Sequence, residues 1–288
     1  QYAGPFSVVV DPSSNIFVSD SFNHRILKYD ANGNLICKWG ANNGAGGPYG
    51  YGSLDGQFFV PRQIAVDSGG NVYVADSCNN RIQKFDNTGK FVVAYGSLGT
   101  LPGYFQLPTG VAVDNNGNIF VADTGNNRIE KFNPFFQLLT YWGSYGTGNG
   151  QFDEPMGLAI DSQNNVYVVD RINNRVQKFN NDGTFITKWG TNGGQGNSNP
   201  LDNWGTGPGD LFLPTGIAID ANNNVFVTDT SNDRMEEYDS SGNYLGQFGQ
   251  FSATDGNFFS PQGVGITKTG HLIIPDGLFQ RIVIYSYN

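Results

Sequence analysis

The charged residues that recur at a fixed spacing in this 288-residue chain are an aspartate and an arginine five positions later. The pair occurs six times, as Asp20 and Arg25, Asp76 and Arg81, Asp123 and Arg128, Asp170 and Arg175, Asp229 and Arg234, and Asp276 and Arg281. Carboxylates accept hydrogen bonds from turn amides, and guanidinium groups donate to several acceptors at once. A residue that is present in every repeat serves every repeat in the same way. We therefore expect these residues to form a structural ring that braces the fold.

Other reactive side chains are scarce. The chain has two histidines, His24 and His271, and two cysteines, Cys37 and Cys78. A zinc site needs three or four clustered ligands, most often histidine or cysteine. The sequence also lacks a Gly-X-Ser-X-Gly nucleophile elbow and a phosphate-binding loop. We therefore expect no catalytic residue, no metal site and no cofactor, and we expect the two cysteines to remain unbridged.

The segments that carry the Asp–Arg pairs have the composition of strands. One unit reads PTGVAVD, NIFVAD, NRIEKF and LLTYWG, and the other units repeat this pattern, with the fourth segment present in five of them. The segments are rich in Val, Ile, Phe and Tyr and are bounded by Gly, Asn or Asp. The recurrent aspartate has a period of 47 residues, lengthened to 56 and 59 at two places. The pattern predicts an all-β fold, a single-domain six-bladed β-propeller of four-stranded antiparallel blades over residues 1–288.

The repeat resembles a known family. The pattern Gly-X-Phe-X-X-Pro-X-Gly-(Val/Ile)-Ala-(Val/Ile)-Asp, followed by Gly-Asn-(Val/Ile)-(Tyr/Phe)-Val-Ala-Asp and Asn-Asn-Arg-(Ile/Val)-Gln-Lys-Phe, is similar to the NHL repeat. The second to fifth units match it best, and the resemblance covers essentially the whole chain. Proteins with this repeat include RNA-binding regulators, extracellular sensor domains and a peptide-amidating lyase. The resemblance therefore implies a propeller fold but not a single function.

In a four-stranded blade, the loop between the second and third strands and the connection to the next blade open on one face, which we name the pore-mouth face. The loops there consist mainly of small residues and Asn, and a few bulky or charged residues depart from that background. We expect ligand or partner binding by these departures: Phe22, His24, Arg62, Met156, Arg171, Ile172, Asp233, Leu278 and Phe279. Neutral variation in loops would explain the same residues equally well.

Two further regions carry aromatic residues. The two longer units have Gly- and Asn-rich insertions, which we expect on the pore-mouth face and which add Tyr49, Tyr51 and Trp204 to the expected binding surface. On the opposite face, the turn Asn133-Pro134-Phe135-Phe136 replaces the Thr-Gly, Asp-Gly or Ser-Gly turns of other blades. We expect Phe135 and Phe136 to form an exposed contact patch.

The sixth unit is short of one strand. In other units the fourth strand ends 18 residues before the next aspartate, as from Gly96 to Asp114, and this spacing does not fit before Asp11. We therefore expect a three-stranded last blade with an apolar edge. Either a longer gene product completes that edge, or a neighbouring molecule pairs with it and builds a homo-oligomer or filament.

The charge balance limits the partners. The formal net charge is −9, from 16 basic and 25 acidic residues, whereas nucleic-acid binders carry a basic surplus. No apolar run approaches the ~18 residues of a membrane helix. We expect neither nucleic-acid binding nor membrane insertion. Few lysines, with abundant Asn, Gly, Ser and Thr, favour an extracellular or cell-surface location.

These observations predict a non-enzymatic binding or assembly module that takes a protein or a polar ligand on the pore-mouth face. The alternative is a lyase or hydrolase with its active site at the pore mouth, since the ring supplies many carboxylates.

Overall fold

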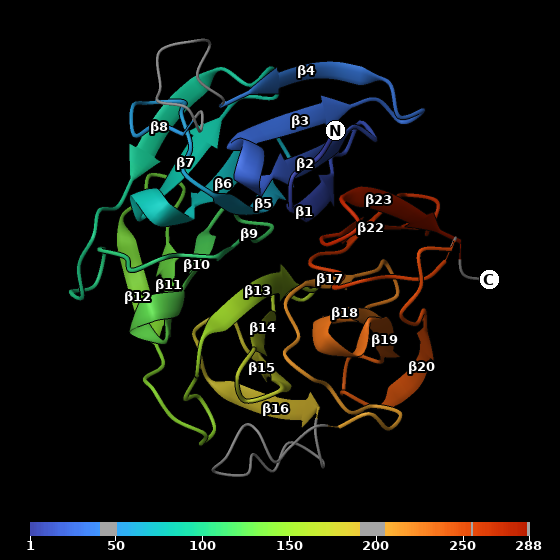
Figure 1. Ribbon diagram of the computed structural model, residues 1–288. Helices are drawn as coiled ribbons and strands as arrows, with labels where there is room; N and C mark the ends of the chain where they lie inside the picture. The colour runs from blue at the N-terminus through green and yellow to red at the C-terminus, as the bar shows by residue number, and fades with distance from the viewer. Residues whose placement is uncertain (41–50, 191–204, 255, 287–288) are drawn as a thin grey trace.

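The computed structural model describes residues 1–40, 51–190, 205–254 and 256–286. Their strands form six sheets arranged around a central axis (Figure 1). Five sheets have four antiparallel strands and the sixth has three. The predicted six-bladed β-propeller is confirmed, together with its three-stranded last blade.

The strands follow one another from the centre of the ring outwards within each blade (Figure 1). Blade one contains β1 (Pro5–Val10), β2 (Ile16–Asp20), β3 (Arg25–Tyr29) and β4 (Leu35–Trp39). Blade two contains β5 (Pro61–Val66), β6 (Val72–Asp76), β7 (Arg81–Phe85) and β8 (Phe91–Tyr95). Blade three contains β9 (Gly110–Val113), β10 (Ile119–Asp123), β11 (Arg128–Phe132) and β12 (Leu138–Trp142).

The second half of the ring repeats this order. Blade four contains β13 (Pro155–Ile160), β14 (Val166–Asp170), β15 (Arg175–Phe179) and β16 (Phe185–Gly190). Blade five contains β17 (Ile217–Ile219), β18 (Val225–Asp229), β19 (Arg234–Tyr238) and β20 (Tyr244–Phe248). Blade six contains β21 (Gly265–Ile266), β22 (Leu272–Asp276) and β23 (Arg281–Tyr285). Short 3-10 helices join second and third strands at η1 (Ser21–Asn23), η2 (Ser77–Asn79), η3 (Thr124–Asn126) and η6 (Thr230–Asn232).

The hydrophobic core lies between neighbouring blades. Phe17 and Ile26 of blade one, for example, pack with Phe58, Val72 and Phe85, which belong to blade two or precede it. Similar clusters fill the spaces between the following blades. Because each second strand is sandwiched between two such layers, β6, β10, β14 and β18 are buried along their whole length. Burial of these strands between sheets is what holds the ring together.

Each recurrent aspartate and arginine form a buried ion pair that also binds the connection between blades. In blade four, Arg175 Nε lies 2.6 Å from Asp170 Oδ2, and Asp170 Oδ1 accepts the amide of Asp153 at 2.8 Å. The rest of the guanidinium donates to the carbonyls of Thr147, Gly148 and Gln151. The pair therefore fastens the segment that enters the blade to the turn between its second and third strands.

In blades two to five, the residue two positions after the arginine lies beside this ion pair. In blades two and four it is a glutamine, and Gln83 donates to Asp76 Oδ2 at 3.0 Å. In blades three and five it is a carboxyl, and Glu130 and Glu236 lie 2.6 and 2.8 Å from the arginine of their pair. Burial raises the pKa of Glu130 to about 7 and that of Glu236 to about 8, although the neighbouring arginine opposes the change. The folded protein thus holds protons there that the unfolded chain releases.

Both cysteines are free, as expected. The Cys37 thiol in β4 lies 3.8 Å from the carbonyl oxygen of Thr88, and Cys78 lies in η2.

We expect the buried ion pairs to be unequal in energy. Arg175 is fully buried, whereas the side chain of Arg25 is 21% exposed and, among the described residues, donates to one carbonyl, that of Gln1. Arg175→Ala leaves Asp170 buried and unpaired, so it should lower the free energy of unfolding by about 3–5 kcal/mol. Arg25→Ala should cost about 1–2 kcal/mol. Urea denaturation of both variants measures the difference, and equal losses would contradict this account of the brace.

We also expect the buried glutamates to make stability depend on pH. A carboxyl whose pKa is raised by folding stabilises the protein below its unfolded pKa, and this contribution disappears as the pH rises through the folded pKa. Stability should therefore fall as the pH rises from about 5 to about 8, by on the order of 5 kcal/mol for the two glutamates together. Glu130→Gln and Glu236→Gln introduce the residue of blades two and four and should flatten this slope. Urea midpoints across this range test it, and an unchanged slope in the double variant would refute it.

Candidate functional site

The inner strands β1, β5, β9, β13, β17 and β21 surround the central channel (Figure 1). At the pore-mouth face the channel widens into a cavity of about 490 Å³, which we name the upper cavity. Its wall comes from the starts of the inner strands, from the turns after second strands and from the segments that enter each blade. The described residues that line it are Phe6, Arg62, Ser77, Cys78, Leu107, Thr109, Thr124, Glu154, Met156, Arg171, Thr215, Thr230, Ser231, Ser260 and Gln262.

Arg62 is the central cation of the upper cavity. It follows the proline of blade two, where the other blades have Phe6, Thr109, Met156, Thr215 or Gln262. Its guanidinium lies 4.5 Å from the centre of the Phe6 ring, and its buried Nε has no hydrogen-bond partner. Burial lowers the pKa of Arg62, and the nearby charge of Arg171 acts in the same direction. An arginine nevertheless stays protonated in proteins, so a positive charge is held in the wall of the cavity.

Arg171 and Glu154 form an ion pair at the rim of the upper cavity. Arg171 Nη1 donates to Glu154 Oε2 at 2.7 Å. Ser21, Thr124 and Thr230 occupy the position of Arg171 in other blades, and each donates its hydroxyl to a proline carbonyl of the next blade. Arg171 has no hydroxyl and cannot make this bond. Blade four therefore lacks the hydroxyl contact to the next blade and has a charged group at the cavity instead.

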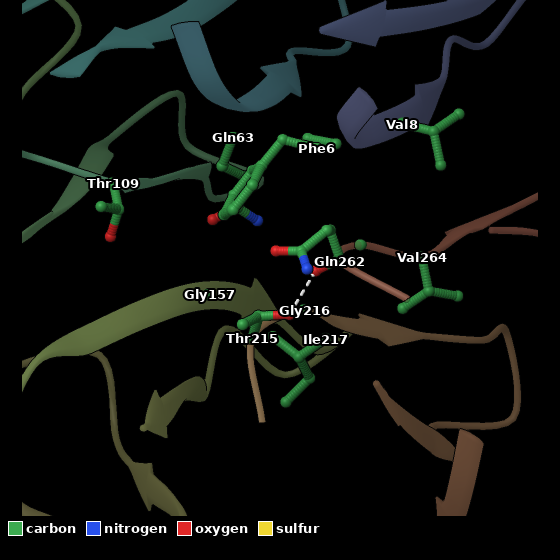
Figure 2. A pocket seen from close by; sticks show the side chains of 12 residues that line it. Phe6, Val8, Gln63, Thr109, Gly157, Thr215, Gly216, Ile217, Gln262 and Val264 are labelled. Carbon is green, nitrogen blue, oxygen red and sulfur yellow. Dashed lines mark hydrogen bonds between the residues drawn. The ribbon is translucent and has the colours of Figure 1, made fainter. Parts of the chain in front are cut away.

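A constriction forms the floor of the upper cavity. Figure 2 shows the side chains of Phe6, Gln63 and Gln262 directed into the channel, where a cavity of only about 20 Å³ remains. That volume holds about one water molecule. Gln63 Nε2 donates to the carbonyl of Leu158 at 2.7 Å, and its Oε1 accepts the amides of Leu158 and Val111. One side chain thus links blades two, three and four and narrows the channel.

Four of the other blades have glycine at the position of Gln63 and cannot carry a large side chain there. A Cβ on Gly110 would lie 2.1 Å from the carbonyl oxygen of Met156, and a Cβ on Gly157 would lie 2.5 Å from that of Thr215. The inner strands approach one another closely at these points, so glycine is required. Gln63 is therefore a specific departure from the repeat.

Below the constriction the channel opens to the opposite face through a second cavity of about 490 Å³, which we name the lower cavity. Asp11, Asp67, Asp114 and Asp220 lie around it, and Thr267 takes the equivalent place in blade six. Each of these aspartates accepts amides of its own turn, as Asp114 accepts those of Asn116 and Asn118. Their carboxylates are engaged in holding the turns between first and second strands.

The structure brings three of the predicted site residues together, namely Arg62, Met156 and Arg171, around the upper cavity. Tyr51 stacks on Phe59 with ring centres 4.5 Å apart and is 44% exposed. Phe22 and Leu278 are exposed on the turns of blades one and six, and Phe279 packs against Phe259. Ile172 is half-buried, and none of Phe22, Ile172, Leu278 and Phe279 lines the upper cavity. Tyr49 and Trp204 lie outside the described residues.

His24 and Asp233, both predicted as binding residues, occupy a position with a structural function. His24 is buried, and its Nδ1 accepts the amide of Val60 at 3.1 Å, while Asp233 accepts the amide of Ser260 at 2.7 Å. Asn80, Asn127 and Asn174 make the same contact to the next blade. His24 and Asp233 therefore substitute for a structural asparagine, and neither lines the upper cavity.

The expected aromatic patch on the opposite face is half wrong. Phe135 is 83% exposed, but Phe136 is buried and stacks on Tyr95 with ring centres 5.3 Å apart. At other blade junctions a tryptophan packs over the glycine of this turn, as Trp39 does over Gly89. Because Tyr95 is smaller than tryptophan, Phe136 fills the remaining space.

Sequence reasoning missed Phe6, Gln63, Glu154 and Gln262. Gln63 could have been found, since it replaces a glycine that four other units share. Phe6 and Gln262 could have been found by extending the comparison at Arg62 to every blade. Glu154 has no signal of its own, because only the fold brings it to Arg171.

The two histidines do not form a site together. His24 is buried beside the pore-mouth face, and His271 lies in a turn between first and second strands, with Nδ1 2.7 Å from the hydroxyl of Thr269. Within the described ranges, no three His, Cys, Asp or Glu residues are grouped so that they could hold a metal ion. In the same ranges, no helix has the length and apolar character needed to cross a membrane.

Comparisons with known proteins agree with the repeat. A model of the NHL repeat matches residues 60–85, 105–132 and 152–179, which belong to blades two, three and four. Peptidyl-glycine alpha-amidating monooxygenase B of Xenopus laevis is 38% identical over 95 residues, 32% of this chain and 10% of that protein. Protein brain tumor of Drosophila melanogaster is 30% identical over 74 residues, 25% of this chain and 7% of that protein. The chain therefore spans a small part of the length of both relatives.

Among solved structures, virginiamycin B lyase from Staphylococcus aureus superposes with a TM-score of 0.64, over 99% of this chain and 85% of that one. The sequence identity is 14%, so this likeness shows the fold alone. Together, these findings show that the chain contains NHL repeats, matched in blades two, three and four, and that its described strands have the fold of a six-bladed β-propeller.

Proposed function

We propose that this propeller is a binding module whose ligand or partner site is the upper cavity. The observation that carries the proposal is that several bulky or charged departures from the repeat line one and the same cavity. Arg62 comes from blade two, Met156 and Arg171 from blade four, and Glu154 from the segment that enters blade four, and all four line the cavity. The lower cavity instead keeps the aspartates of the repeat. Neutral variation in loops has no reason to concentrate large and charged side chains around one cavity.

Shape also supports binding at this face. The upper cavity is open at the pore-mouth face and narrowed at its floor by Phe6, Gln63 and Gln262. A pocket that narrows in this way surrounds a ligand on several sides, which ligand sites in proteins generally do. The alternative is a lyase or hydrolase with its active site in the same cavity, where Glu154 is the one carboxylate among the described lining residues.

We further propose an extracellular or cell-surface location. The low content of charged residues, 14% of the chain, supports this part of the proposal, as do the many Asn and Gly residues of the turns.

To test the site, we would replace Arg62, Met156 and Arg171 by threonine, the residue that blades three and five carry at the equivalent positions. The fold should be retained, because Thr109, Thr124, Thr215 and Thr230 are accommodated there already. Saturation-transfer NMR with a mixed library of small polar molecules should show ligands that bind the native protein and not the triple variant. Equal binding to both proteins would place the site elsewhere. Conversion of a bound ligand over time, absent in the variant, would favour the enzymatic alternative.

Self-association through blade six is a second part of the proposal. In the described residues β23 is the outer strand of its sheet, and Ile284 is 65% exposed there. An unpaired strand edge with an apolar side chain can pair with another chain. We expect concentration-dependent dimers or larger species in sedimentation velocity, reduced by Ile284→Lys. A monomer at all concentrations would remove this part of the proposal and leave the upper cavity unaffected.

A further inference from the structure

The guanidinium of Arg62 is a largely buried cation without an anionic partner. No hydrogen bond or ion pair joins it to any residue in the described part of the chain, and its Nε is buried and unsatisfied. Its contact is the face of Phe6, 4.5 Å from the guanidinium carbon. A cation–π contact replaces only part of the hydration that a buried charge loses. The N–H groups of the Arg62 guanidinium therefore lack, among the described residues, a hydrogen-bond acceptor, which a ligand could supply.

The charge of the upper cavity is that of one cation. Among the described residues that line it, the charged ones are Arg62, Glu154 and Arg171. Glu154 and Arg171 neutralise each other at 2.7 Å, which leaves the charge of Arg62. A ligand with a single negative charge would balance the cavity, whereas a dianion would retain an excess charge next to Glu154.

The surroundings of Arg62 favour a ligand that also has an apolar part. Phe6, Leu107 and Met156 contribute apolar surface to the same cavity. The planar fork of a guanidinium matches the two oxygens of a carboxylate, which it binds through parallel hydrogen bonds. A small molecule that has both a carboxylate and an apolar body meets both conditions.

We propose that the upper cavity binds a small organic carboxylate, with the carboxylate on Arg62 and the apolar body between Phe6 and Met156. This inference rests on the proposed function and names the ligand class of the same site. Arg171 and Glu154 bound the site at its rim, and the constriction at Gln63 limits how deep the ligand extends.

The test compares two probes of nearly equal shape, benzoate and the neutral benzamide, by isothermal titration calorimetry at millimolar concentrations. Benzoate should bind the native protein more tightly than benzamide. Arg62→Gln, the residue of blade six, should weaken benzoate about tenfold or more and leave benzamide almost unchanged. Lys268→Gln removes one positive charge at the lower cavity and should leave benzoate binding intact.

A second variant distinguishes the effect of charge on benzoate binding from an effect of lost stability. Arg171→Thr supplies the hydroxyl that Thr124 and Thr230 use to bind the next blade, so this variant should be at least as stable as the native protein. It also frees Glu154 to face the cavity without a partner, and benzoate should therefore bind this variant more weakly.

Each result decides the inference. If benzoate does not bind, binds no better than benzamide, or binds Arg62→Gln equally well, the inference is wrong. If inorganic phosphate displaces benzoate at equal concentration, the site selects charge alone and the carboxylate assignment is wrong. Other library ligands that are lost in the triple threonine variant would still support the proposed function, so the two failures are distinguishable.

Discussion

The buried ion pair between the recurrent aspartate and arginine is the interaction on which the rest of this propeller depends. In blade four, Asp170 and Arg175 are both almost inaccessible to water, and together they bind the amide and carbonyl groups of the segment entering the blade. That segment has little regular structure of its own, so without the pair its buried backbone groups would lack partners. The pair thereby determines where each inner strand begins and where each turn lies on the pore-mouth face.

Because the backbone of the pore-mouth face is fixed in this way, single positions there can change without altering the fold. The residue after the aspartate is a serine or threonine in blades one, three and five, where it bonds the next blade, and becomes Arg171 in blade four. The residue after the blade's proline becomes Arg62 in blade two. Neither change disturbs the ion pairs of its blade, since Arg81 and Arg175 keep their aspartates at 2.8 and 2.6 Å. A repeated framework thus allows a site without repeat symmetry to form at its centre.

The difference between repeated framework positions and single changed positions explains how much could be predicted from the sequence. The strands, their order and the number of blades could be predicted, because each depends on a pattern that recurs along the chain. The prediction for His24 and Asp233 interpreted a change of residue type as a change of role, whereas both side chains accept the backbone amide that asparagine accepts in other blades, from Val60 and Ser260 respectively. Phe136 failed for a related reason, since its burial depends on Tyr95 in the neighbouring blade. Only a comparison of both neighbouring blades could have shown that Tyr95 replaces a tryptophan and Phe136 replaces the glycine that packs against it.

The unpaired guanidinium of Arg62 lowers the stability of the folded protein, and the framework tolerates this loss. A buried charge without a counter-charge destabilises the folded state, and the repeat offers Thr or Gln at the same position without that penalty. A ligand that covers the guanidinium would exclude water from it, and this exclusion would strengthen the interaction between the two. The Phe6 ring on one side further limits the orientations that the guanidinium can adopt. The stability lost at Arg62 is therefore available as affinity and selectivity at the upper cavity, while the six ion pairs between second and third strands maintain the ring in which the site is held.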